Sequence, residues 1–454
     1  MKEKPPKMIR RIIHFVLMLF INSILLIFKK INVTFKFFNK RNGKFKRNFK
    51  IFLEDYKRSI KEGLIALLIC AVGDLIAGII LGNMTFFLET YPGLLVLIPG
   101  AIGMRGNIFG SFGSRLSSNL HIGILTPEFK KSEVLVNNIL SSLVLTMVLS
   151  LFLAVVAKFI CIIMGFVSMP LSDFIIISVV AGIISSLIML PITMFVSLKS
   201  FENGWDPDNI TTPVIAAFGD LFTLPCIILS IYILNIVSLF IVIKYIVLVF
   251  LIILIVSAIY YGLKVSEETR DIIKQSTPVL LVCSFFGSFA GGVFNSSLET
   301  LLTNPSLLTL LPLFSGESGS LISILGARLS SGLHSGLIEP GLRPKKNTIF
   351  NFLICIILAV IVYPVIGFIA ETSSYAFGLK GLGYPQIISI SFISGLILII
   401  IMMFVVFYIS TISYKKGLDP DNIVIPVSTS ITDTISSFIL IMVSLIITGA
   451  IVLI

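Results

Sequence analysis

The sequence has little charge and few of the residues that build soluble catalytic sites or zinc sites. Only 13% of its 454 residues are charged, and it contains three histidines and one tryptophan. Its five cysteines all lie in apolar stretches, with no C-x-x-C pair and no Cys/His cluster. We therefore expect neither a disulfide framework nor a zinc site. No long polar segment interrupts the chain, which excludes a soluble catalytic domain within it.

Apolar residues dominate what is present. The chain is 56% hydrophobic, with a mean hydropathy of +1.06, which is typical of a polytopic membrane protein. Each of its long apolar runs can cross a hydrocarbon layer of about 30 Å as a helix. The expected spans, about 11 in all, are 63–84, 94–116, 134–164, 171–197, 210–235, 239–262, 276–298, 307–329, 348–370, 384–410 and 422–452.

One module of the sequence occurs twice, at a constant offset that pairs Pro92 with Pro305. Segment 92–127 aligns with 305–340 without a gap, and 16 of 36 positions are identical. Segment 206–220 aligns with 419–433 at the same offset, with 8 of 15 positions identical. A module of five spans ends on the side opposite to its start, so the run 239–262 is needed to return the chain. We therefore predict an all-α membrane protein with two parallel five-helix repeats and one linker helix, related by a pseudo-two-fold axis along the membrane normal.

The predicted domains follow from this arrangement. They are a basic N-terminal segment over 1–60, a first five-helix module over 61–238, a linker helix with an inner loop over 239–275, and a second module over 276–454. Within the first segment, the apolar stretch 12–28 has basic residues on both sides. We expect an in-plane helix there, bound to anionic lipid of the inner leaflet, with a spanning helix as the alternative.

Positive charge is concentrated in the loops on one predicted side of the membrane. With the N-terminus inside, the predicted inner loops carry eleven lysines and arginines, whereas the predicted outer loops carry acids and one clear cation, Lys380. This bias follows the positive-inside rule. It predicts a multi-pass protein of the plasma membrane with a cytoplasmic N-terminus and an external C-terminus.

The most informative polar residues are two equivalent acids, Asp220 and Asp433. Each lies 13 residues beyond the proline that opens its helix, or about 20 Å along the helix axis, near the middle of the membrane. A lone acid at that depth is costly and usually functional. Two acids related by the pseudo-axis would neutralise one divalent cation. The alternative is a pair of structural acids, protonated or hydrogen-bonded.

The same helices start with an Asp-Pro pair and contain a second proline six residues later. The aspartate suits a helix cap and the first proline suits the first helical position. The internal proline frees the carbonyl four residues earlier, which then needs a partner such as an ion. Capping and a packing kink are the structural alternatives. The candidate ion-binding residues from this pattern are Asp206, Asp419, Asn209 and Asn422.

Two further acids break the repeat. Glu317 has Met104 as its counterpart, and Asp74 has Gly287. Acids within spans that occur in one copy only are candidates for binding the transported ion or a coupling ion. The surrounding helix is rich in glycine and proline in both copies, which suits close helix packing as well as backbone contact with an ion.

The two repeated motifs resemble those of the MgtE magnesium transporter family, most closely its fused eukaryotic branch, solute carrier family 41. GMRGNIFGSFGSRLSS in the first copy is similar to the family's G-x-K-G-N…S-R-L-S motif, and DPDN…P……D in both copies is similar to its pore-helix motif. The resemblance covers about 63–454. It implies a pore between two five-helix modules, with Asp220 and Asp433 as the pore aspartates.

The resemblance implies further details. The inner polar position of the family falls on Thr212, whose counterpart is Ile425, and the G-N pair of the motif places Asn107 beside the pore. Bacterial members form the pore by homodimerisation, so this chain should form it as a monomer. The cytoplasmic regulatory domains of those members do not fit within segment 1–60.

The function that fits is transport of a divalent cation, Mg²⁺ or else Mn²⁺, without a cofactor, an enzymatic activity or a nucleic-acid partner. One alternative is a Na⁺- or H⁺-coupled exporter or exchanger, in which Glu317 and Asp74 bind the coupling ion. Another is a membrane-embedded, metal-dependent transferase that uses the DPDN segments. The transferase would need a denser acid cluster and a phosphate site, and the sequence has neither.

Overall fold

The computed structural model describes residues 64, 67, 68, 70–121, 123–126, 132–202, 207–334, 336–416 and 420–449. Every regular element among them is an α-helix, as predicted. Ten helices in these ranges are long and apolar enough to cross a membrane. The in-plane helix expected at 12–28 and the C-terminal end of the chain lie outside the described residues.

The helices confirm the repeat, because most of them begin at positions related by the offset of the two motifs. The first copy contains a Cys70–Gly82 helix, α3 (Thr85–Thr90), α4 (Leu94–His121), α5 (Glu133–Ile163), α6 (Leu171–Glu202) and α7 (Pro207–Ser238). After α8 (Ile241–Val265), the second copy contains α9 (Glu267–Asn295), α10 (Leu298–Thr303), α11 (Pro305–His334), α12 (Lys346–Ala376), α13 (Tyr384–Lys415) and α14 (Pro420–Ile447). Within the described residues, the span expected at 63–84 is represented by the Cys70–Gly82 helix, so the count of eleven spans stays a prediction.

Equivalent helices also make equivalent contacts. Arg115 on α4 donates a hydrogen bond from Nε to the Oδ1 of Asn138 on α5, at 2.6 Å. Arg328 on α11 does the same to Asn351 on α12, at 2.8 Å. A charged donor to an amide oxygen is a strong hydrogen bond. Each repeat therefore fixes its second and third long helices with the same side chains at the same level.

The first long helix of each repeat packs against the other repeat. In the second copy, α9 lies along α4 and α5, and a Cβ added at Gly287 would lie 2.6 Å from the Cα of Gly100. In the first copy, a Cβ added at Gly78 would lie 2.2 Å from the carbonyl oxygen of Thr309 on α11. Glycine permits these close backbone approaches, because any side chain there would collide. The exchange of first helices joins the two repeats into one bundle.

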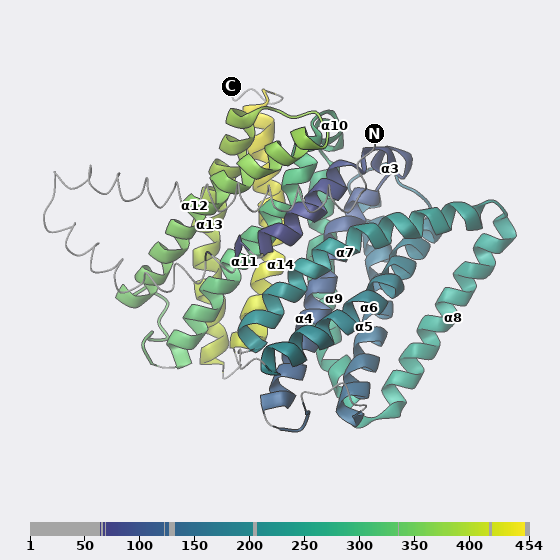
Figure 1. Ribbon diagram of the computed structural model, residues 1–454, viewed down its shortest axis with the longest axis horizontal. Helices are drawn as coiled ribbons and strands as arrows, with labels where there is room; N and C mark the ends of the chain where they lie inside the picture. The colour runs from purple at the N-terminus through teal and green to yellow at the C-terminus, as the bar shows by residue number, and fades with distance from the viewer. Residues whose placement is uncertain are drawn as a thin grey trace, which may run out of the picture.

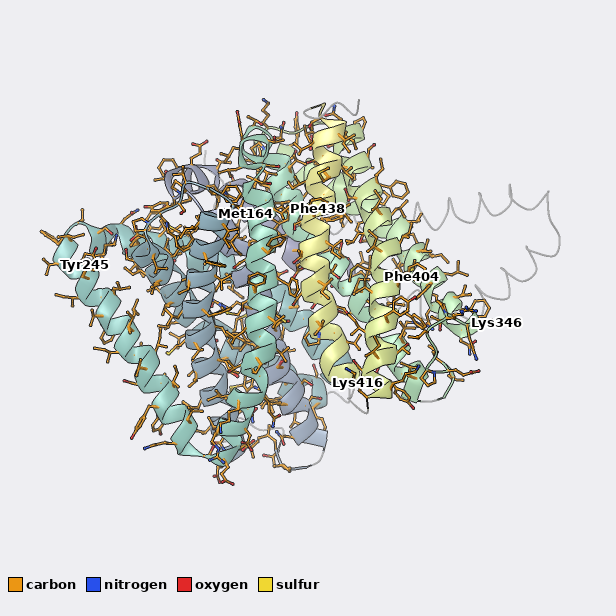
Figure 2. All side chains as sticks on the ribbon, turned by 180° about the vertical axis from the view of Figure 1, so that it is seen from behind. Met164, Tyr245, Lys346, Phe404, Lys416 and Phe438 are labelled. Atoms are coloured by element: carbon orange, nitrogen blue, oxygen red, sulfur yellow. The ribbon has the colours of Figure 1, made fainter. Side chains whose placement is uncertain are left out.

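The linker helix α8 lies at the edge of this bundle (Figure 1). Most of its apolar side chains are exposed, as expected for a surface that faces lipid. Figure 2 shows exposed Tyr245 of α8 and Phe404 of α13 on opposite sides of the bundle. An ion pair between Lys244 and Asp173 joins the start of α8 to the start of α6. The helix therefore connects the two repeats without entering the centre of the molecule.

Candidate functional site

A cavity of about 420 Å³ lies between the two repeats. Its wall comes from α4 and α7 of the first repeat, from α9, α11 and α14 of the second, and from residues of the first helix, including Cys70. The wall is mostly apolar. Its polar side chains are Asn107, Asp220, Ser315, Ser320, Ser323, Thr429 and Asp433. The cavity thus collects oxygen atoms from both repeats at the place where they meet.

Asp220 and Asp433 both line this cavity, at equivalent depth in two helices that begin at the expected prolines. Asp433 accepts a hydrogen bond from Ser315 of α11, with 2.7 Å between the oxygens. Asp220 instead lies next to the buried carboxyl group of Asp74. The two equivalent acids therefore face the same cavity with different partners.

Glycines and prolines predicted to matter for packing form part of the cavity wall. Pro99, Gly103 and Gly106 of α4 line it, and so do their counterparts Pro312, Gly316 and Gly319 of α11. A Cβ added at Gly106 would meet no heavy atom within 4 Å, which means open space beside its backbone. At Gly106 the missing side chain leaves room for a ligand next to the main chain.

The structure separates the other candidate residues into three groups. Asn107 lines the cavity, and so does Ile425, the counterpart of Thr212. Glu317 and Asp74 are almost fully buried just behind the cavity wall. Asp206 and Asp419 lie outside the described residues, and so do the side chains of Asn209, Thr212 and Asn422, although their backbones belong to α7 and α14.

Sequence analysis missed the serine that holds Asp433. Ser315 has Ile102 as its counterpart in the first repeat, so the repeat gave no signal for it. Ser320, whose hydroxyl lies close to the thiol of Cys70, differs from Ser315, because its counterpart is the predicted candidate Asn107. The signal that was available is position, because both serines lie within one turn of Gly316 or Gly319 on α11.

A buried arginine behind the wall was also missed. Arg105 of α4 is 1% exposed, and its Nε donates a hydrogen bond to the Oγ of Ser185 on α6 at 2.7 Å. In the second repeat the corresponding space contains Tyr363, whose ring lies against Gly395 and whose hydroxyl is 2.9 Å from Ser318. A large side chain thus fills the same space from different helices in the two repeats, which keeps the packing tight.

Within the described residues, no group of three or more His, Cys, Asp or Glu side chains could hold a metal ion.

Comparison with known families gives two matches in this chain. The sequence model described as "MgtE: Divalent cation transporter" matches residues 98–230 and again 311–443. These two ranges fall at the same offset as the repeat, and each covers α4 to α7 or α11 to α14 in large part. The match covers more than half of the chain and includes Asp220 and Asp433.

Several curated proteins are similar over most of their length. Solute carrier family 41 member 2 of Gallus gallus is 24% identical over 431 residues, which cover 87% of this chain and 72% of that protein. Member 2 of Homo sapiens is 25% identical, with coverage of 83% and 68%. Member 3 of Rattus norvegicus is 22% identical, with coverage of 83% and 84%. No solved structure matches the chain.

Proposed function

Because the chain belongs to the MgtE family of divalent cation transporters, we propose that it carries Mg²⁺ through the cavity between its repeats, with Asp220 and Asp433 as paired ligands. The observation that supports this most strongly is their position. Both acids face one cavity, and each comes from the equivalent place in its repeat. Transport of divalent cations, as opposed to an enzymatic reaction, is the activity of the family, so the transferase alternative is set aside.

Charge supports a divalent ion at this site. Two ionised carboxylates near the middle of a membrane are costly, because the surrounding hydrocarbon cannot solvate them. One divalent cation between Asp220 and Asp433 compensates both charges without a second protein cation. Oxygen ligands also select hard cations such as Mg²⁺ and Mn²⁺ over copper or zinc, which prefer thiolate and imidazole.

The size of the cavity supports a hydrated ion. A space of about 10–15 Å³ suffices for one water molecule, so a cavity of about 420 Å³ has room for an ion with its first shell of waters. The hydroxyls of Ser323 and Thr429 and the side chain of Asn107 are placed to bind such waters. The ion would then pass the centre of the membrane held largely through water.

The pseudo-dimeric architecture supports function as a monomer. Both acids come from one chain, whereas a single five-helix repeat would supply only one. As a multi-pass protein, it would lie in the plasma membrane, with a cytoplasmic N-terminus and anionic lipid along its basic segment 1–60.

A coupled exporter or exchanger is the second candidate. Asp74 and Glu317 favour it, because they add buried acids to one side of the cavity and have no counterpart on the other. A passive symmetric pore has no need for such a difference. Sodium- or proton-driven transport would use these acids for the coupling ion.

Uptake into proteoliposomes tests the proposal. The purified full chain is reconstituted, and Mg²⁺ entry is followed with a trapped fluorescent indicator, under an imposed voltage or an imposed Na⁺ gradient. We expect Asp220→Asn and Asp433→Asn to lose most of the flux, and Asp173→Asn, a control acid paired with Lys244 on α8, to keep it. Normal flux in both cavity variants would refute the paired-ligand mechanism. Dependence of the wild-type flux on a Na⁺ gradient would select the coupled carrier.

A further inference from the structure

The two sides of the cavity differ in their acids although their backbones are equivalent. The acidic half consists of Cys70, Asp74, Asp220, Glu317 and Ser320. The plain half consists of their counterparts, Cys283, Gly287, Asp433, Met104 and Asn107. Each half draws its residues from both repeats, because the first helices are exchanged. The acidic half contains three carboxyl groups and the plain half contains one.

Asp74 lies behind the cavity wall, and its carboxyl group is directed toward that wall. It is 2% exposed, its carboxyl group contacts that of Asp220, and a Cβ added at Gly316 would lie 2.2 Å from its Oδ2. That Oδ2 has no hydrogen-bond partner within the described residues. Gly316 lines the cavity, so the unpartnered oxygen lies against a part of the wall that has no side chain.

Glu317 adds a second buried acid without a partner. It is 1% exposed, and neither carboxyl oxygen has a hydrogen-bond partner within the described residues. Its nearest surroundings are aliphatic, including Leu67 of the first helix and Val362 of α12. It lies close enough to Asp74 for the two charges to repel. A buried polar group without a partner is rare in proteins and calls for an ion, a water or a functional role.

No cation of the protein compensates these acids within the described residues. Arg105, the buried arginine on α4, donates to Ser185 on α6. None of the ion pairs between described residues includes Asp74, Asp220 or Glu317. One divalent ion shared by Asp220 and Asp433 compensates two of the four carboxylates around the cavity. The other two, Asp74 and Glu317, are both in the acidic half.

We propose that the acidic half binds a cation of its own, between Asp74 and Asp220, beside the ion on the pseudo-axis. The inference rests on the proposed function, since Asp220 belongs to both sites. The ligand is a hard cation that prefers oxygen, because the carboxyl groups of Asp74 and Asp220 lie side by side here and the hydroxyl of Ser320 lines the same half of the cavity. Glu317 supplies negative charge behind the site. The bound cation is either a second transported divalent ion or a monovalent ion such as Na⁺.

The plain half has no space for the same site. A Cβ added at Gly287, the counterpart of Asp74, would lie 2.6 Å from the Cα of Gly100. An aspartate at that position would therefore push α9 away from α4. Met104 replaces Glu317, and Ser315 already satisfies Asp433. The second cation site is consequently limited to one per chain.

Binding stoichiometry tests this site. The purified full chain is titrated with Mn²⁺, which shares the oxygen preference of Mg²⁺, and bound ion is measured from the loss of the electron paramagnetic resonance signal of free Mn²⁺. A parallel arm compares thermal unfolding in NaCl and in choline chloride at equal ionic strength. The variants are Asp74→Asn, Asp433→Asn and the control Asp173→Asn. Asp74→Gly, which copies Gly287, serves if the asparagine variant does not fold.

Two results support the site. If its ion is divalent, the wild type binds about two Mn²⁺ and each cavity variant binds about one. If its ion is monovalent, the wild type binds about one Mn²⁺. Na⁺ then raises the unfolding temperature of the wild type and of Asp433→Asn above the choline value, but not that of Asp74→Asn. Asp173→Asn behaves as wild type in both arms.

The site is refuted if Asp74→Asn binds as much Mn²⁺ as the wild type and responds equally to Na⁺. In that case, loss of Mn²⁺ binding in Asp433→Asn would still support the axial ion, which is the ion shared by Asp220 and Asp433. Conversely, full Mn²⁺ binding and transport in Asp433→Asn, with loss of both in Asp74→Asn, would contradict the axial ion and uphold the second site. The two claims therefore fail separately.

Discussion

The acidic half and the plain half of the cavity are built on the same backbone with different chemistry. In the plain half, Asp433 is held by Ser315 and lies over Gly103, with 3.6 Å between its Oδ2 and a Cβ added there. In the acidic half, Asp220 contacts Asp74, which is pressed against Gly316. One acid is satisfied by a neutral hydroxyl and the other has a second acid beside it.

This difference shows what two repeats within one chain permit. Two identical subunits must present the same residues on both sides of their axis. Two repeats in one chain can keep the shared acid and change everything around it on one side only. Asp74, Glu317 and Ser315 are such changes, since their counterparts are Gly287, Met104 and Ile102. The symmetric part suits an ion on the axis, and the asymmetric part suits coupling or selectivity.

The largest effect should come from the two axial acids. Asp220→Asn and Asp433→Asn should each lower Mg²⁺ flux at least about tenfold, or about 1.4 kcal/mol of ion binding. Asp220→Asn should be the more severe, because Asp74 loses its neighbour as well. The double variant should cost less than the sum of the two, since both belong to one site. Additive losses in proteoliposome flux would mean that the two acids act independently.

A matched pair of glycine variants sharpens the comparison. A Cβ at Gly316 would lie 2.2 Å from the Oδ2 of Asp74, whereas one at Gly103 would lie 3.6 Å from that of Asp433. Gly316→Ala should therefore displace Asp74, lower flux several-fold and cost about 1–3 kcal/mol of unfolding free energy, as overpacking does. Gly103→Ala should stay close to wild type in both respects.

A double variant that removes the clash between Asp74 and the methyl group added at Gly316 is the control for the two glycine variants. Asp74→Gly combined with Gly316→Ala gives the acidic half the small residue of the plain half, so unfolding by heat should return to the wild-type temperature. Equal thermal stability of Gly316→Ala and Gly103→Ala would contradict the different packing of the two halves.

A smaller effect should follow from replacing Glu317 by its own counterpart. Glu317→Met removes a buried acid that has no partner within the described residues and fills the space with an apolar side chain. Such a replacement is often stabilising, here on the order of 1 kcal/mol. Met104→Glu should destabilise by a similar amount or more. Thermal unfolding of both variants without divalent ions measures this, and a loss of stability in Glu317→Met would show that the acid has a partner when the protein folds.

The smallest perturbation tests whether the repeats are parallel. All five cysteines are buried, so single surface cysteines can be labelled selectively. Phe86→Cys and Glu299→Cys, which are equivalent, should react with a membrane-impermeant maleimide from the outside of intact cells. Glu133→Cys and Lys346→Cys should react only after permeabilisation. Labelling of equivalent positions from opposite sides would refute the parallel arrangement.

Much of the fold follows from the repeat, whereas the partners of each acid do not. The fixed offset located the starts of α12, α13 and α14 from those of α5, α6 and α7, and it placed Asp220 and Asp433 at equivalent depth. The exchange of first helices could not be predicted, because an alignment shows that Gly78 resembles Gly291 without showing which repeat either residue contacts. The pairing of Asp74 with Asp220 depends on that exchange.

Side-chain partners that occur in one copy only could not be predicted from the sequence either. Ser315 gave no signal, since its counterpart is Ile102, and a serine within a glycine-rich helix has many uses. Arg105 and Tyr363 fill equivalent spaces from different helices, which no position-by-position comparison detects. These contacts depend on how the helices pack in three dimensions, and an alignment of the two repeats does not show that packing.

The position of the bound ion tests the central claim most directly. Crystals of the full chain grown with Mn²⁺ would give an anomalous difference map that locates the ion without reference to flux. The account predicts a peak in the cavity between Asp220 and Asp433 in the wild type, and its loss in Asp433→Asn. Mn²⁺ bound only outside the cavity, or an unchanged cavity peak in the variant, would contradict a transported ion held by the paired aspartates.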